Sequence, residues 1–339
     1  MTAENKLITF TVPCYNSAAY MSTCIESILS SNAKDIEIIL VNDGSKDNTG
    51  EIADEYAEKY PDIIKAVHQE NGGHGAAVMT GVHHACGKYF KVVDSDDRLD
   101  TDALKYALTV LRGLDEDIDV LVANYVYDKV GKKHKKSIRY TGTMPENRIF
   151  TWDETKHFKK GEYLLMHALI YRTQLILDSG LELPRHTFYV DNLYAYVPLS
   201  ISEKLYYIDA DLYYYFIGRE DQSVKEEIMI KRIDQQLRVN RMMAEQVDLN
   251  TVREPKLRQY LYNYLEIITT VSCILITVSD TEENYKKRDE LWEHLYSVDK
   301  DTADTLRHGI MGTFSNLSGK ARPVAVAVYH LANKIFGFN

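Results

Sequence analysis

The stretch from Lys88 to Arg98 reads Lys-Tyr-Phe-Lys-Val-Val-Asp-Ser-Asp-Asp-Arg, a mainly apolar run that ends in carboxylates. The run predicts a buried strand, and Asp94 and Asp96 follow it with the small residue Ser95 between them. In an open α/β sheet, ligands bind beyond the carboxyl ends of the strands. Two carboxylates at this spacing can hold a hard divalent cation, which can hold phosphate oxygens. An isolated Asp-X-Asp is more often an Asp-rich turn, so the interpretation depends on the rest of the chain.

The composition is that of a soluble globular protein. The 339 residues are 45% hydrophobic and 27% charged, which allows one large core or two domains and argues against disorder. The formal net charge of −10 excludes nucleic acid as a general partner, because binding an extended phosphate backbone needs a basic face. A single bound nucleotide remains compatible with this charge.

Cysteine usage and hydropathy indicate the compartment. The four cysteines, Cys14, Cys24, Cys86 and Cys273, include no Cys-X-X-Cys pair. The N-terminus lacks the basic and then apolar pattern of a signal peptide. No run reaches the ~18 consecutive apolar residues of a membrane-spanning helix. We therefore expect a cytoplasmic protein, with any membrane contact peripheral and on the inner face.

Strand and helix patterns alternate through the first third of the chain. The expected strands begin at Leu7, Asp35, Ile63 and Lys88, and the expected helices end near Ser30, Tyr60, Ala85 and Arg112. Four such strand–helix units in a row predict an α/β fold with a mostly parallel sheet and helices on both faces. The loops after the first, second and fourth strands then meet at one edge of the sheet.

Four fragments at this edge carry a family resemblance. They are Val12-Pro-Cys-Tyr-Asn16, Val41-Asn-Asp-Gly-Ser45, Asn71-Gly-Gly-His-Gly75 and Asp94-Ser-Asp-Asp97. In this order and spacing they resemble the family-2 glycosyltransferases of the GT-A fold, over roughly residues 7–98. The resemblance implies a Rossmann-like domain that binds a nucleotide-activated sugar, with a divalent metal, Mn²⁺ or Mg²⁺, on the diphosphate.

The resemblance also assigns residues to the donor site. Pro13, Tyr15 and Asn16 line the base and ribose pocket, Asp43 meets the uracil edge, Asp94 meets the ribose, and Asn71, Gly75, Ser95 and Arg219 complete the donor-binding set. Asp96 is the direct metal ligand, with Asp94 beside it. The chemistry agrees, because uracil N3–H and the ribose hydroxyls are donors that a carboxylate can accept. Pro13 and Tyr15 could instead only end and pack a strand.

One departure from the family pattern concerns the glycine loop. Many members continue this loop with Ala-Arg-Asn, whereas this chain reads Ala76-Ala-Val-Met79, so an arginine contact to the donor is missing here. His74 lies in the loop itself. A histidine in such a loop is more often a hydrogen-bonding surface residue, so we leave His74 outside the catalytic set.

The fragment Phe188-Tyr-Val-Asp-Asn-Leu-Tyr194 resembles the place of the family's catalytic base. Members commonly have Glu-Asp there before an apolar helix. In this chain Val190 replaces the Glu and Asp191 remains, so the resemblance makes Asp191 the base. Asp191 also suits the N-cap of the following helix, and both roles can hold at once.

The second half changes character after an aromatic segment. Lys204–Phe216 reads like a strand pair, whereas 226–247, 254–278 and 281–298 show helical spacing. We therefore expect a nucleotide-sugar-binding catalytic domain over residues 1–221 and a helical region over 222–339. An apolar stripe from Val324 to Phe338, flanked by basic residues, could pack on its own region, on a second subunit or on an anionic membrane surface.

These observations lead to one functional hypothesis and two alternatives. We expect an inverting, metal-dependent transferase that moves a hexose or N-acetylhexosamine from a UDP-sugar to a hydroxyl of a glycan, polyol-phosphate or lipid-linked acceptor, as in cell-wall or polysaccharide biosynthesis. The first alternative is a non-catalytic nucleotide-sugar sensor or assembly scaffold. The second, a sugar nucleotidyltransferase, is disfavoured because Pro13–Ser17 offers no basic side chain for a triphosphate.

Overall fold

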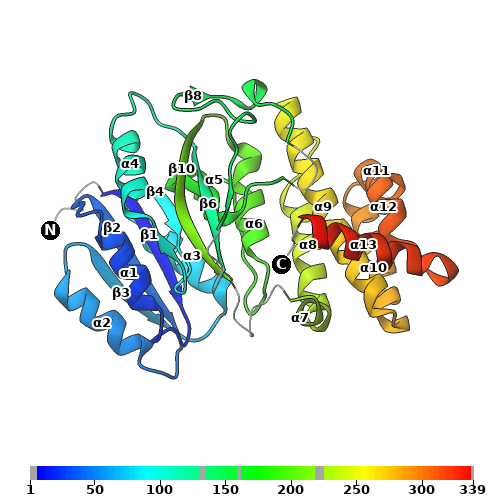
Figure 1. Cartoon of the computed structure of the whole chain (residues 1–339), viewed down its shortest axis with the longest axis horizontal. Coiled ribbons are helices and arrows are strands. Elements are labelled where there is room, and N and C mark those ends of the chain that lie inside the picture. The colour runs from blue at the N-terminus through cyan, green and yellow to red at the C-terminus, as the bar shows by residue number, and fades with distance from the viewer. Residues whose placement is uncertain (1–5, 130–134, 159–161, 218–224, 337–339) are drawn as a thin grey trace. The chain divides into compact units, whose positions relative to one another are not determined.

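The computed structural model describes residues 6–129, 135–158, 162–217 and 225–336 (Figure 1). It separates into two compact units. Residues Met1–Phe158 and Leu164–Arg219 form the first unit, and residues Lys159–Tyr163 and Glu220–Asn339 form the second. The first unit contains the sheet and the second is helical. The predicted α/β fold with a C-terminal helical region is therefore confirmed.

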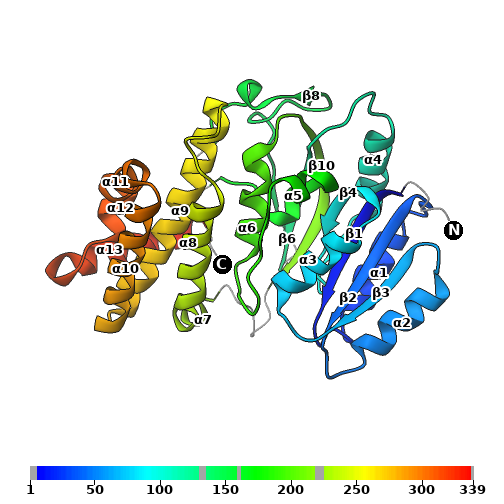
Figure 2. The ribbon, with the colours of Figure 1, turned by 180° about the vertical axis from the view of Figure 1, so that it is seen from behind.

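The sheet of the first unit begins with four parallel strands. They are β1 (Lys6–Cys14), β2 (Ile36–Asp43), β3 (Ile64–Gln69) and β4 (Gly87–Val92). The helices between and after them are α1 (Met21–Leu29), α2 (Thr49–Lys59), α3 (His74–His84) and α4 (Thr101–Arg112). Figure 2, which views the fold from behind, shows α3 along β1 and β2, on which it packs. The predicted alternation of strands and helices is confirmed for these units.

The remaining strands of this sheet do not follow one another in the order of the sequence. The order is β3-β2-β1-β4-β9-β6-β10-β5, with β7 on β6 and β8 on β10. These elements are β5 (Arg98–Leu99), β6 (Val120–Lys129), β7 (Lys136–Ile138), β8 (Ile149–Phe150), β9 (Leu169–Arg172) and β10 (Leu205–Ile217), with the short helices η1 (Trp152–Glu154), η2 (Met166–Ala168), α5 (Thr173–Asp178), α6 (Asp191–Tyr196) and η3 (Pro198–Ile201).

Strand β9 matters most for the site. It runs antiparallel between β4 and β6, with Phe90 opposite Tyr171 and Leu121 opposite Ile170. Because β9 runs opposite to β4, its first residues lie beside the carboxyl end of β4. The η2 turn just before β9 is therefore brought to the edge that carries Asp94.

The expectation of a strand pair over Lys204–Phe216 is wrong. Strand β10 is continuous, and its pairing with β6 shifts register between Ile208 and Tyr213. Such a bulge lets one strand carry extra residues without turning back. Polar partners satisfy the bulged region: Asn124 donates to Asp209 (2.7 Å), and Arg139 pairs with both Asp209 and Asp211 (2.7 and 2.9 Å). Asp209 and Asp211 are thus held inside the strand.

The second unit consists of helices. They are α7 (Glu226–Lys231), α8 (Ile233–Gln246), α9 (Pro255–Ser279), α10 (Glu282–Val298), α11 (Lys300–His308), α12 (Ile310–Ser315), η4 (Gly319–Ala321) and α13 (Arg322–Phe336). The three expected helical stretches are confirmed, and α11 and α12 were not expected. By length and composition α9 could cross a membrane, but 72% of its most apolar window is buried in the structure. It is the core helix of this unit, against which α8, α12 and α13 pack.

Candidate functional site

Asp43 holds two loops together at the carboxyl edge of the sheet. It is the last residue of β2 and is only 2% exposed. Its Oδ1 accepts from the Gly72 amide and its Oδ2 from the Gly73 amide, each at 2.8 Å, while Asn71 Nδ2 donates to its main-chain oxygen at 2.9 Å. Gly44 has a φ of +68°, so a residue without Cβ suits this turn. Asp43 therefore fixes the glycine loop, and its contact with uracil stays a prediction.

The loop after β1 presents an aromatic side chain at the same edge. Pro13 is buried within β1, whereas Tyr15 is 50% exposed. Asn16 has a φ of +50°, and it is held to the second loop because its Oδ1 accepts from the Lys46 amide at 2.8 Å. Ser17 Oγ and Ser95 Oγ lie 2.8 Å apart. The loops after β1, β2 and β4 therefore meet, and the Tyr15 ring is accessible for stacking on a base.

The four residues Asp94–Asp97, which follow β4 after Val93, differ in how far they are buried. Asp97 is buried, and it accepts from the Tyr213 hydroxyl (2.6 Å) and from the Phe216 amide (2.7 Å). Burial and the charges of Asp94 and Asp96 raise the pKa of Asp97 well above its ordinary value. Asp94, Ser95 and Asp96 are only partly buried. Asp97 therefore ties the edge to β10, while the other three remain reachable by a ligand.

His74 is a site residue that the sequence interpretation excluded. It is the first residue of α3, and its Nε2 lies 2.8 Å from Asp94 Oδ1. Burial acts to lower the pKa of His74, but Asp94, Asp191 and Asp96 together raise it above its ordinary value. His74 therefore lies among three carboxylates of the predicted site. The sequence pattern could have indicated this role, because His74 begins a helix at the same sheet edge as the Asp-X-Asp motif.

The predicted base, Asp191, is placed by a strained loop. His186 and Tyr189 have φ values of +49° and +67°, which are unusual for residues with a side chain, and such strain is concentrated at functional sites. The His186 amide donates to the Gly72 carbonyl at 2.7 Å, so this loop rests on the glycine loop. A Cβ on Gly73, whose φ is +82°, would lie 2.9 Å from that His186 amide.

Asp191 itself is the first residue of α6, which has Val190 as its N-cap and no side-chain capping bond. The expected capping role of Asp191 is therefore wrong, because the helix starts one residue earlier than the pattern suggested. Burial raises the pKa of Asp191, with His74 opposing and Asp94 adding to the increase. A raised pKa makes this carboxylate a better proton acceptor near neutral pH.

Two buried basic residues, Lys91 and His167, lie near Asp94. Lys91 Nζ donates to the main-chain oxygens of His167 (2.8 Å) and Leu169 (3.3 Å). Burial lowers the pKa of Lys91 to about 7 and that of His167 to about 4, with Asp94 opposing both shifts. Conversely, burial alone would raise the pKa of Asp94, but His74, His167 and Lys91 hold it below its ordinary value. The sequence interpretation missed both basic residues, although a lysine within an apolar strand was a usable signal.

The donor set at this edge fits a divalent metal. Ligand atoms of Asp94, Asp97 and His167 all lie within 4.8 Å of one another. Carboxylate oxygens and a neutral imidazole nitrogen are established ligands for divalent cations. Asp96 is not part of this group, although it lies between two of its members in the sequence. Arg219, the remaining predicted donor contact, lies outside the described residues.

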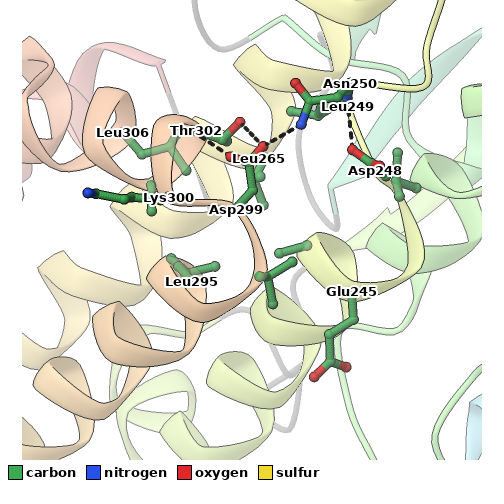
Figure 3. A pocket seen from close by; sticks show the side chains of 14 residues that line it. Glu245, Asp248, Leu249, Asn250, Leu265, Leu295, Asp299, Lys300, Thr302 and Leu306 are labelled. Carbon is green, nitrogen blue, oxygen red and sulfur yellow. Dashed lines mark hydrogen bonds between the residues drawn. The ribbon is translucent and has the colours of Figure 1, made fainter.

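The second unit contains a separate cavity of about 380 Å³ (Figure 3). It lies between the α8–α9 connection and the start of α11, and none of the predicted site residues lines it. Asn250 Nδ2 donates to Asp299 Oδ2 at 3.0 Å, and the Asn250 amide donates to Asp248 Oδ1 at 2.9 Å, as the dashed lines show. The polar side chains of Asp248, Asn250 and Asp299 therefore already have hydrogen-bond partners in the cavity wall.

Comparisons with known proteins agree with this geometry. Residues 9–173 match the family described as Glycosyl transferase family 2. The chain is 31% identical over 239 residues to the uncharacterized glycosyltransferase EpsJ of Bacillus subtilis, covering 66% of this chain and 64% of EpsJ. It is also 31% identical over 234 residues to the glycosyltransferase GlyA of Streptococcus pneumoniae, covering 65% of this chain and 32% of GlyA. The chain thus spans less than two thirds of these relatives.

Solved structures show the same fold. Staphylococcus aureus TarS 1-349 in complex with UDP-GlcNAc superposes with a TM-score of 0.68 at 18% identity, covering 96% of this chain and 92% of TarS. The mannosyltransferase PcManGT from Pyrobaculum calidifontis, in complex with GDP-Man and Mn²⁺, gives a TM-score of 0.53 at 13% identity, covering 98% and 88%. At these identities the likeness concerns the fold alone.

Proposed function

We propose that this chain, whose residues 9–173 belong to glycosyl transferase family 2, transfers a hexose or N-acetylhexosamine from a UDP-sugar to an acceptor hydroxyl, with inversion and a divalent metal. One observation carries the proposal. The Asp-X-Asp edge and the carboxylate of Asp191 act on the same imidazole, that of His74, although the sequence separates them widely. The residues proposed to bind the donor and to act as the base therefore both lie beside His74.

The donor half of the site follows from the edge loops. In this proposal the exposed Tyr15 ring stacks on the base, with Pro13 and Asn16 completing the pocket. Asp43, Asn71 and Gly75 shape the loop that approaches the donor, and the partly buried Asp94 accepts from the ribose hydroxyls. The complexes of TarS with UDP-GlcNAc and of PcManGT with GDP-Man support a nucleotide-sugar donor for this fold.

The metal is proposed to lie on the diphosphate, held by Asp96 and Asp94. A divalent metal held by these residues would offset the negative charge that grows on the departing UDP. Ser95, between the two aspartates, holds the segment to the first loop through Ser17. The glycine loop is followed by Ala76-Ala-Val-Met79, which includes no arginine. Neutralisation of the diphosphate charge by the metal is therefore more important, because this segment offers no cationic side chain.

The acceptor half depends on Asp191. An acceptor hydroxyl is a poor nucleophile until its proton is removed. Asp191 takes this proton while the hydroxyl oxygen attacks C1 of the sugar from the face opposite UDP. Burial raises the pKa of Asp191 and His74 opposes this increase, and a raised pKa makes the carboxylate a better proton acceptor. Glycans, polyol-phosphates and lipid-linked sugars are the acceptor classes that this chemistry serves.

The proposed location is the cytoplasm, where nucleotide sugars are made. Within α13, Val324 and Val328 are 55% and 43% exposed, whereas Ala325 is buried. The valine side of α13 therefore faces solvent and does not pack on its own unit. We propose that Val324 and Val328 contact a second copy of the chain or the inner face of the membrane.

A thermal-shift series tests donor recognition. UDP, UDP-glucose, UDP-galactose, their N-acetyl forms and GDP-mannose are each added with Mn²⁺ or with EDTA. A ligand at ~100 times its dissociation constant adds about 2.7 kcal/mol to the free energy of unfolding. We expect the UDP compounds to raise the Tm with Mn²⁺ and to lose most of this effect in EDTA. A stabilisation by GDP-mannose alone would reject the UDP assignment, and no stabilisation by any compound would reject the donor site.

A further inference from the structure

His167 is a buried imidazole that the proposed reaction does not use. It belongs to η2, is 5% exposed, and its Nδ1 has no hydrogen-bond partner in the described part of the chain. A buried polar atom without a partner loses the hydrogen bonds that it makes to water in the unfolded chain, which destabilises the fold. A missing ion or water is one of the recognised reasons for such an atom. The imidazole therefore requires an explanation beyond packing.

The position of His167 relative to Asp94 is fixed from two sides. Lys91, on β4, binds the main-chain oxygens of His167 and Leu169, so the strand that leads to Asp94 also holds the η2 turn. The imidazole packs against the rings of Tyr213 and Tyr215, with centroid distances of 4.8 and 4.4 Å. The ring is therefore held before any ligand arrives, as a ligating residue should be.

The groups near this ring favour a cation. Three carboxyl groups lie within four consecutive residues, at Asp94, Asp96 and Asp97, and they outnumber the one buried amine, Lys91, which binds the main chain of the η2 turn. Ligand atoms of Asp94, Asp97 and His167 lie within 4.8 Å of one another, so a cation held by Asp94 can reach the histidine with small adjustments. Asp97 already accepts two hydrogen bonds, from Tyr213 and Phe216, and each of its oxygens keeps one lone pair.

We propose that His167 gives a ring nitrogen to the divalent metal that Asp94 holds, so that the site combines oxygen and nitrogen ligands. This inference rests on the proposed metal-dependent function of the same edge. Mg²⁺ takes oxygen ligands almost exclusively, whereas an imidazole favours first-row transition metals. The histidine, which lies far outside the Asp-X-Asp in the sequence, therefore makes the site selective for Mn²⁺ over Mg²⁺.

The direct test is pulsed electron paramagnetic resonance on the full chain with Mn²⁺ and UDP. A coordinated imidazole gives nitrogen modulation of the electron spin echo. We expect this modulation in the wild type, a changed pattern after ¹⁵N labelling of the protein, and its loss in His167→Phe, which keeps a packed ring. The control is His74→Gln, which removes the other imidazole beside Asp94 and should retain the modulation.

The wild-type spectrum alone can overturn the proposal, so it does not depend on the variant folding. Bound Mn²⁺ without protein nitrogen modulation rejects it, as does modulation that is lost in His74→Gln but kept in His167→Phe. Failure of the proposed function is distinct, because it would leave nitrogen-ligated Mn²⁺ in a protein that transfers no sugar.

Calorimetry supplies a second readout. We expect His167→Phe to weaken Mn²⁺ binding by about 10- to 100-fold, the range found when residues supporting a metal are removed. Mg²⁺ binding should change much less, so the ratio of the two affinities falls. An equal loss for both metals would show that His167 only supports packing, and the nitrogen-ligand proposal would be wrong.

Discussion

Replacing Asp191 with asparagine is expected to lower sugar transfer by about 10²- to 10⁴-fold, the usual contribution of a general base. The amide has nearly the size of the carboxylate but cannot take the acceptor proton. Asp191 is the first residue of α6 rather than its N-cap, and an asparagine oxygen can still accept from the amides of the first turn, so the start of the helix should be kept. Donor affinity and Tm should therefore remain close to those of the wild type. Steady-state transfer, UDP-sugar binding and thermal unfolding are measured on the same preparation.

A matched control for this variant is Asp178→Asn, an exposed aspartate at the end of α5 in the same unit. It should transfer sugar at the wild-type rate. Full activity of Asp191→Asn would refute the assignment of the base, and Asp153, Glu154 or His186 would be tested next. A lower Tm together with lost donor binding would instead mark Asp191 as a structural residue.

Replacing Asp96 with asparagine is the second change with a large expected effect. If Asp96 is a direct ligand, the variant should weaken metal-dependent UDP binding by about 10- to 100-fold, because a neutral amide oxygen attracts a hard cation less than a carboxylate does. Asp96 is partly buried, so the Tm of the free protein should change little. Titration of UDP in the presence of Mn²⁺ and of EDTA separates the metal-dependent part.

The comparison variant is Asp97→Asn. Both oxygens of Asp97 accept hydrogen bonds, from the Tyr213 hydroxyl and the Phe216 amide. An amide group there must direct its NH₂ toward one of these donors, so this variant should lower the Tm while affecting metal-dependent binding less. If Asp97→Asn weakens metal-dependent binding as much as Asp96→Asn does, the direct ligand is Asp97. Equally small effects at both positions would remove the metal site from this edge.

The first half of the fold could be predicted because its signals are local. The helix over Thr101–Arg112 is bounded by Asp100, whose side chain accepts from two amides, and by Gly113, and the sequence shows both. The apolar strands β1, β2 and β4 are equally plain, because nearly all residues of each are buried. Local patterns therefore placed the elements and the edge at which they end.

The site could be predicted only where a known motif marked it. His167 reaches Asp94 because β9 inserts antiparallel between β4 and β6, and no local pattern encodes that insertion. His74 gains its importance from Asp94 and Asp191, which lie 20 and more residues away. Arrangement in space, rather than residue type, distinguishes these histidines from surface ones.

Bulges and short helices were harder for a related reason. Lys204–Phe216 suggested a strand pair, but it belongs to one bulged strand, in which Asn124 and Arg139, far earlier in the chain, satisfy Asp209 and Asp211. Helices α11 and α12 are 9 and 6 residues long, too short for a clear periodic pattern. In both places distant contacts override the local signal.

The most direct test of the central claim is UDP release from UDP-sugars by the full chain. The purified protein is incubated with each UDP-sugar, with Mn²⁺ or EDTA and without acceptor, since water can replace the acceptor slowly. We expect slow, Mn²⁺-dependent UDP release from at least one UDP-sugar, abolished by EDTA and strongly reduced in Asp191→Asn. UDP-sugar binding with no release above the buffer rate, even after candidate acceptors are added, would contradict it and indicate a non-catalytic nucleotide-sugar sensor.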